Sequence, residues 1–393
     1  MNPKRIHRSI LRRLLSLRQS RHVSRVRLVA RLHNAELLGG NSVRPVLLFI
    51  PDLHLLSHES DDCYRFSFLK LEPGRSVKRA VLLDQFCQAI LDFRNTLADP
   101  RMLKIVQLGD LVDLWRENEI KGDTLNTMMS RILDDNPEAR RRLVRKGAES
   151  LKPDVVQGNH DWRLSKSHEL RRANPAHVYK VDGKKTILVT HGHFFDWIED
   201  FSDELQEFFV ETFGRSAKPR KHQLDRKKSH PKEDLIDEEE TFWPDDNETT
   251  GPQGAAPRVL TREEESDHLP AEVNVWVTRG TFNLEKMIEG HRLLPRALTY
   301  AKRLRAGTKR YVNRLRLSGR LPHLQTIVIG HSHYARICIH YEWGTPAKHF
   351  VLVDCGAWIG YARFGNTLVP SCQIGVLCGG DMRIYQLDPH PRL

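Results

Sequence analysis

The chain has 393 residues and a formal net charge of +12. At roughly 100–200 residues per domain, this length allows two or three domains, or one large domain with an insertion. Hydrophobic residues make up 39% of the chain, enough for a sizeable core, and the positive charge favours anionic partners such as phosphates, nucleic acid or an acidic membrane face.

Residues 1–35 carry ten Lys or Arg and no acid, and apolar residues recur at helical spacing at Ile6, Ile10, Leu14 and Leu17. A basic amphipathic helix is typical of segments that lie on anionic lipid. Organelle transit peptides and disordered basic arms share this composition, and the sequence leaves all three interpretations open. We therefore assign residues 1–40 to a basic amphipathic arm.

The chain lacks a run of about 18 apolar residues, so we expect no membrane-spanning helix. Its six cysteines are dispersed without a CxxC pair, which indicates reduced thiols, mostly in the core, rather than a disulfide framework. These features predict a cytoplasmic protein. Any contact with a membrane would be peripheral, at its inner face, and would be made by residues 1–35.

Short apolar runs predict strands at residues 46–50, 103–108, 154–156, 186–190 and 325–329. Further strands are expected near residue 337 and at 350–353, 374–377 and 382–387. One helix is predicted after Ser76, taken as its N-cap, and another over 124–149 with an interruption near Pro137. The alternation of strands and helices predicts a layered α/β fold with polar motifs just past the strand ends, where open sheets bind ligands.

The alternation stops between the fourth and fifth of these strands. Residues 199–212 suggest an amphipathic helix, 215–270 a mobile loop with mixed charge, and 282–317 a basic helical stretch. We therefore expect one domain built from residues 43–200 and 320–393, with residues 201–319 as a helical and irregular insertion.

Side chains that bind divalent metals follow five of the predicted strands. Carboxylate, amide and imidazole ligands suit Mn, Fe or Zn, and the lack of thiolates argues against a structural zinc site. The set exceeds one coordination shell, which favours two ions that act together on a phosphoryl group. The candidates are Asp52, His54, Asp110, Asp113, Asn159, His160, His191, His331 and His333.

The series resembles the calcineurin-like metallophosphoesterase superfamily, whose motifs are D-x-H, G-D-x-x-D, G-N-H-[DE], H and G-H-x-H. This chain has DLH at 52–54, GDLVD at 109–113, GNHD at 158–161, THGH at 190–193 and GHSH at 330–333. The resemblance covers both halves of the expected domain but neither the arm nor the insertion. It implies a four-layer αββα sandwich of two mixed sheets flanked by helices.

The resemblance also implies roles for individual residues. One metal would be held by Asp52, His54 and His333, the other by Asn159, His191 and His331, with Asp110 bridging them. The two ions would be Mn, with Fe or Zn as alternatives. Water between them would become hydroxide and attack phosphorus in line. His160, oriented by Asp113, would assist the leaving oxygen, and the role of His193 stays open.

Within this superfamily, the chain resembles the branch of UDP-2,3-diacylglucosamine diphosphatases at Trp115, Phe195 and Asp196. This resemblance implies a nucleotide-sugar or lipid-linked diphosphate as substrate. His160 and His193 depart from that branch, many members of which have Arg and Asp there. A nuclease or nucleotide phosphodiesterase is the alternative, since the positive charge would supply phosphate contacts. A non-enzymatic binding scaffold is a third hypothesis, against which the intact ligand set argues.

Overall fold

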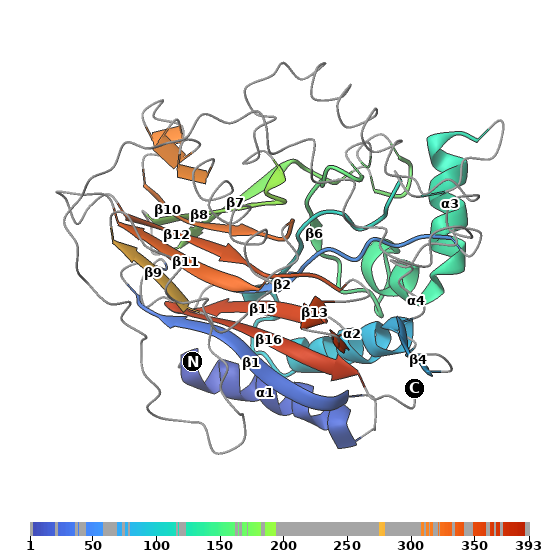
Figure 1. The fold of residues 1–393 in the computed structure, drawn as a ribbon, viewed down its shortest axis with the longest axis horizontal. Helices are drawn as coiled ribbons and strands as arrows, with labels where there is room; N and C mark the ends of the chain where they lie inside the picture. Colours follow the sequence, from blue (N-terminus) through green and yellow to red (C-terminus); the bar gives the residue numbers. More distant parts are fainter. Residues whose placement is uncertain are drawn as a thin grey trace.

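The computed structural model describes residues 3–193, 275–279 and 308–389, apart from short stretches inside the first and last of these ranges. Two six-stranded sheets face each other (Figure 1). In order across the first sheet, the strands are β1 (Val23–His33), β16 (Asp381–Pro389), β15 (Gln373–Cys378), β2 (Val46–Ile50), β5 (Leu103–Gln107) and β6 (Asp154–Val155). Those of the second are β7 (Ala176–Val181), β8 (Lys185–Thr190), β10 (Leu324–Ile329), β12 (His349–Asp354), β11 (Arg336–Tyr341) and β9 (Val275–Arg279).

Both sheets are mixed. β2, β5 and β6 run parallel, whereas β15 is antiparallel to both β2 and β16. In the second sheet β8, β10 and β12 run parallel, and β7 and β11 are antiparallel to their neighbours β8 and β12. Two small hairpins complete the strands, β3 (Leu69–Glu72) with β4 (Arg75–Val77), and β13 (Ala362–Phe364) with β14 (Thr367–Val369).

Helices cover the outer face of the first sheet. They are α1 (Pro3–Gln19), α2 (Arg79–Asn95), α3 (Leu125–Asp135) and the short α4 (Pro137–Ala139), which continues into the π-helical turn η2 (Arg140–Val144). A 3-10 turn, η1 (Pro100–Met102), leads into β5. In Figure 1, α1 and α2 lie beneath the first sheet, and α3 and α4 lie at one end of it.

Three separate apolar clusters fill the spaces between the layers. Leu48 and Ile50 of β2 pack with Phe86 of α2 on the outer side of the first sheet. Leu47 and Phe49 of the same strand point the other way, into the cluster between the two sheets. A third cluster covers the outer face of the second sheet. A strand that is buried on both faces reads as an unbroken apolar run, which explains why VLLFI at 46–50 predicts β2.

The fold is the expected α/β arrangement of two mixed sheets in a sandwich. All the strands named from the sequence are present within a residue or a few of their predicted limits, and the helix over 124–149 does break at Pro137. The N-cap prediction is wrong, because Ser76 lies in β4 and α2 begins at Arg79.

The N-terminal residues differ from the predicted arm. Ile6, Ile10 and Leu14 are fully buried in the core beside α2, and β1 pairs with β16 as the outer strand of the first sheet. The apolar face of α1 is therefore covered by the protein itself rather than available for lipid. Exposed basic residues, including Arg5, Arg8 and Arg12, line the opposite side.

The expected insertion also contributes to the fold, since β9 pairs in parallel with β11 inside residues assigned to it. Val312 and Leu315 from its far end pack on the outer face of the second sheet. The predicted helix at 199–212, the loop at 215–270 and most of the stretch at 282–317 fall on residues that the structure does not describe.

The described part of the chain bears on the predictions for membrane spans and cysteines. None of its helices has both the length and the hydropathy needed to cross a bilayer. Of its five cysteines, four are buried, and no disulfide joins any two of the five.

Candidate metal centre

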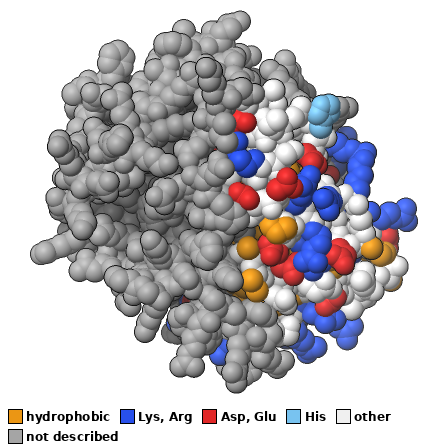
Figure 2. Space-filling model, turned by 90° about the vertical axis from the view of Figure 1, so that its right-hand side faces the viewer, with side chains coloured by type: hydrophobic (Ala, Val, Ile, Leu, Met, Phe, Trp, Pro, Cys, Tyr) orange, Lys and Arg blue, Asp and Glu red, His pale blue; other side chains and the backbone are white. Residues whose placement is uncertain are grey.

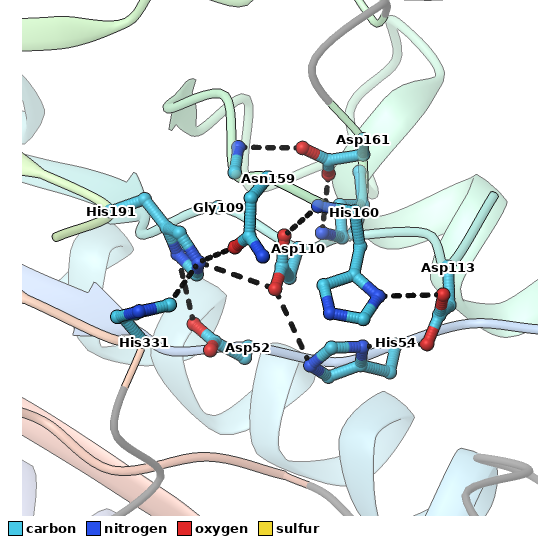
Figure 3. A network of polar contacts seen from close by, with 12 residues as sticks. Asp52, His54, Gly109, Asp110, Asp113, Asn159, His160, Asp161, His191 and His331 are labelled. Atoms are coloured by element: carbon cyan, nitrogen blue, oxygen red, sulfur yellow. Dashed lines mark hydrogen bonds and ion pairs between the residues drawn. The ribbon is translucent and has the colours of Figure 1, made fainter. Parts of the chain in front are cut away.

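Five loops carry the candidate ligands, and each follows the C-terminal end of a strand. Because β2, β5 and β6 run parallel in one sheet and β8 and β10 in the other, these ends gather at one edge of the sandwich. The structure brings together eight of the nine candidates (Figure 3): Asp52, His54, Asp110, Asp113, Asn159, His160, His191 and His331. The ninth, His333, lies outside the described residues.

Backbone hydrogen bonds join these loops to one another. The amide of His54 donates to the carbonyl of Asp110 at 2.8 Å, within the first sheet. Gly330 donates to the carbonyl of His191 at 3.1 Å, within the second, and Trp358 donates to that of Asp52 at 2.7 Å, across the two sheets. The loops therefore hold their side chains as one assembly.

Three of the site residues have positive φ angles, +48° at His54, +46° at Asp110 and +23° at His331. Non-glycine residues rarely adopt such angles, which cost of order 1–3 kcal/mol each. Strain of this kind persists where the surroundings fix it, and it concentrates at functional sites. Three instances in one cluster support a functional role for this edge of the sandwich.

Two glycines in the motifs allow the carboxylates to approach the backbone. A Cβ at Gly158 would lie 1.9 Å from Oδ1 of Asp110, and one at Gly330 would lie 2.1 Å from Oδ1 of Asp52. Both distances are far below contact, so any other residue would displace the carboxylate. The glycines that precede Asn159 and His331 in the motifs are thus required by packing.

The ring of His191 offers one nitrogen to a cation. Its Nδ1 is 3.1 Å from the carbonyl oxygen of Leu108, which can only accept, so Nδ1 carries the proton. Burial lowers the pKa of His191 and favours the neutral ring. The lone pair of Nε2 then faces Oδ1 of Asn159 at 2.9 Å and Oδ2 of Asp110 at 3.2 Å.

Lone pairs that face each other repel unless a proton or metal ion lies between them. Nδ1 of His331 is also 3.1 Å from this Nε2. Two imidazole nitrogens, an amide oxygen and a carboxylate oxygen are a donor set that divalent transition metals accept. The hydrogen bond from Nδ1 to a backbone carbonyl is the usual way to orient such a histidine ligand.

Asp110 lies at the centre of the cluster. Its Oδ2 is 3.2 Å from Nε2 of His191 and 3.5 Å from Nε2 of His54, which belong to different sheets. Burial alone would raise the pKa of Asp110, but His191, His160 and His54 outweigh it and hold the pKa well below its usual range. Its Oδ2 therefore reaches both sides of the site, as the predicted bridging role requires.

Asp113 orients two histidines at once. Its Oδ2 accepts from Nδ1 of His54 at 3.0 Å, and its Oδ1 accepts from Nδ1 of His160 at 2.8 Å. Its pKa is lowered against the effect of burial, chiefly by the charge and hydrogen bond of His160. With Nδ1 committed in each ring, Nε2 is the nitrogen left for a metal or a substrate.

Asp52 is fully buried, with Oδ1 3.6 Å from Nδ1 of His191. Burial and the neighbouring charges of Asp110 and Asp354 raise its pKa well above the usual range. Two buried carboxylates this close disfavour each other's charge, and a divalent cation removes that conflict.

The described residues form two groups that can hold metal ions, each offering three ligand atoms within 4.8 Å of one another. One contains His54, Asp113 and His160, and the other Asp52, Asp110 and His191. Two groups agree with the expectation of two ions, but their membership differs from the resemblance, which pairs Asp52 with His54. The individual roles stay predictions.

Two further residues belong to the site. His193 is close to the second group, with its ring centroid 5.4 Å from that of His191, so its position leaves a role open. Asp161 was not assigned a role from the sequence, although it stands inside the GNHD motif. Its carboxylate accepts from the amides of Gly158 at 2.6 Å and Leu111 at 2.7 Å, and so ties two ligand loops together.

Comparison with known proteins adds no relative, since neither a scan against family models nor a search of curated proteins finds a match.

Proposed function

We propose that this protein is a phosphoester hydrolase that works with two divalent metal ions, in the manner of the calcineurin-like metallophosphoesterases that its motifs resemble. The environment of His191 carries the proposal. Its Nε2 lies within 3.2 Å of Oδ1 of Asn159, Oδ2 of Asp110 and Nδ1 of His331, a set of oxygen and nitrogen atoms that a divalent cation accepts as ligands. On the other side of Asp110, Nε2 of His54 lies 3.5 Å from Oδ2 and offers a ligand for a second ion.

When bound, the two ions would supply Lewis acidity to a phosphoryl group and lower the pKa of a water nucleophile. The chain's own residues would do the rest. Asp110 shares its charge between both sides of the site. Asp113 holds the His160 ring, whose side chain is 17% exposed and whose Nε2 can donate a proton or hydrogen bond to the leaving oxygen.

The nuclease alternative depends on a continuous basic surface. On the face seen in Figure 2, basic and acidic side chains are intermingled. Among the described residues, arginines of η2 form ion pairs, Arg140 with Glu169 and Arg141 with Asp84. The described part of this face therefore offers no continuous basic surface to a long nucleic acid.

For the substrate, the resemblance favours a nucleotide-sugar or lipid-linked diphosphate. The residues behind this finer proposal, Trp115, Phe195 and Asp196, are not among those described. A panel of phosphomonoesters, phosphodiesters and nucleotide-sugar diphosphates would rank the substrate classes directly.

The proposal is tested with bis-p-nitrophenyl phosphate as substrate. We expect hydrolysis in excess Mn²⁺, its loss in EDTA, and two bound ions per chain by calorimetry. His191→Ala should bind less Mn²⁺ and lose activity, whereas His168→Ala, on an exposed loop, should match the parent protein. Absence of Mn²⁺ binding in the parent protein would favour the scaffold hypothesis and overturn the proposal.

A further inference from the structure

A buried carboxylate outside the motifs lies directly behind the candidate site. Glu117 is fully buried, and its Oε2 accepts from the amide of Ser57 at 2.9 Å, while its Oε1 accepts from the hydroxyl of the same residue at 2.5 Å. Ser57 follows His54 by three residues, and Glu117 follows Asp113 by four. One side chain thus connects the loops of His54 and Asp113, two of the three that carry the first metal-binding group.

The contact extends a backbone ladder between these loops. The amide of Leu55 donates to Leu111 at 3.0 Å, and Asp113 in turn donates back to the carbonyl of Leu55 at 3.0 Å. The Glu117 carboxylate takes the next position, where it accepts the amide of Ser57 in place of a main-chain carbonyl. Glu117 therefore holds the loops of His54 and Asp113 at a fixed distance from each other, at the end of the ladder that lies away from the metal site.

Arg131 of α3 balances the buried charge. Its Nε and Nη2 each lie 3.2 Å from Oε1 of Glu117, while Nη1 lies 2.8 Å from Oδ2 of Asp123. A guanidinium that binds a carboxylate through two nitrogens fixes its orientation as well as its charge. The clamp thus runs from α3 through Glu117 to the loop of His54.

We infer that Glu117 is a positioning residue for the first metal-binding group, acting through Ser57 on His54 and through the shared ladder on Asp113. The inference rests on the proposed metal centre and adds a residue that no motif contains. Partners that orient a ligand without touching the ion typically change metal affinity or activity by about 10–100-fold when they are removed.

The test compares Glu117→Gln with Asp123→Asn in the full chain. Both variants remove one negative charge from Arg131, but only the first disturbs the contact with Ser57. We expect Glu117→Gln to lower the affinity for the more weakly bound Mn²⁺ about 10–100-fold by calorimetry. Asp123→Asn should change it less than about 3-fold, the range of ordinary surface substitutions.

A second variant covers the case in which Glu117→Gln does not fold. Ser57→Ala keeps the amide that donates to Glu117 and removes only the hydroxyl, so we expect a smaller loss of Mn²⁺ affinity in the same direction. Saturating Mn²⁺ should restore most of kcat in both variants, since the ligands themselves remain.

The outcomes separate this inference from the proposed function. If the parent protein binds two Mn²⁺ ions and Glu117→Gln binds them equally well, with only a lower melting temperature, Glu117 is merely structural and the inference is overturned. If the parent protein binds no Mn²⁺, the proposed function itself is wrong. Reduced affinity in Glu117→Gln and Ser57→Ala but not in Asp123→Asn supports the positioning role.

Discussion

Two clusters of buried histidine and aspartate in this protein differ in what balances their negative charge. In the cluster between α1 and β16, the carboxylate of Asp381 is 2.7 Å from Nη2 of Arg383, and Nη2 of Arg31 is 3.6 Å away. His7 completes it through a 3.1 Å hydrogen bond to the carbonyl of Asp381. Burial alone would raise the pKa of Asp381, but Arg383, His7 and Arg31 together outweigh burial and lower it.

At the candidate metal centre, histidines occupy the places that Arg383 and Arg31 take in the other cluster. The groups that hold the Asp110 pKa low are His191, His160 and His54, which carry a positive charge only when protonated. Burial opposes that protonation at His191. A permanent internal cation thus balances the charge of the closed cluster around Asp381, whereas neutral histidines leave the charge of the open cluster around Asp110 to be balanced by an external cation.

The largest expected effect comes from removing the central charge of the open cluster. Asp110→Asn should lower Mn²⁺-dependent turnover by roughly 10³–10⁴-fold, because an amide cannot share a negative charge between two cations. Hydrolysis of bis-p-nitrophenyl phosphate in excess Mn²⁺ measures this. Asp134→Asn, at an exposed ion pair with Arg140, is the control and should stay near parent activity. Full activity in Asp110→Asn would rule out a bridging role.

Much of the site follows from the sequence because each motif stands directly after a strand. Asp52 and Asp110 follow apolar runs whose parallel pairing brings their ends together. Asp161 could have been included, since it ends the GNHD motif. Glu117 could not, because its partner Ser57 is 60 residues away and neither belongs to a periodic or motif pattern.

The fold is predictable where a strand is buried on both faces, and less so at the sheet edges. Residues 23–33 alternate apolar residues with Arg25, Arg27 and Arg31, which is the pattern of a half-buried strand, but their basic composition instead predicts an arm. They become β1 because β16, more than 300 residues later, supplies both the pairing and Asp388 as the partner of Arg27. Composition alone carries no signal for a partner so distant.

The two clusters should respond oppositely to loss of a carboxylate. In EDTA, Asp381→Asn should destabilise the fold by about 3–5 kcal/mol, because it leaves Arg383 buried without its charge partner. Asp52→Asn should stabilise the fold, because burial and the charges of Asp110 and Asp354 oppose ionisation of the Asp52 carboxyl in the folded protein, and the amide does not carry this cost. Urea unfolding at pH 7 measures both.

Excess Mn²⁺ sharpens this contrast. It should stabilise the parent protein and Asp381→Asn alike, by about 2.7 kcal/mol for each bound ion at a free concentration 100-fold above its dissociation constant. Asp52→Asn should gain much less. A loss of stability in metal-free Asp52→Asn would mean that the open cluster already contains its own counter-charge.

The smallest expected effect concerns pH and the closed cluster. Burial, and secondarily Arg383 and Arg31, lower the pKa of His7 to about 4, while Asp381 acts in the opposite direction. Since the folded protein resists protonation of His7 more than the unfolded chain does, the stabilisation is complete above pH 6.5 and is lost as pH falls towards 4. Between pH 7 and pH 5 the loss should be about 2 kcal/mol.

His7→Gln isolates this contribution, because glutamine can still donate to the carbonyl of Asp381 but does not titrate. Histidines elsewhere in the chain affect both proteins equally and cancel in the difference. Urea unfolding at the two pH values should therefore show a drop in stability about 2 kcal/mol larger in the parent protein than in the variant. Equal drops would mean that His7 accepts a proton without cost and that the closed cluster, too, tolerates an added positive charge.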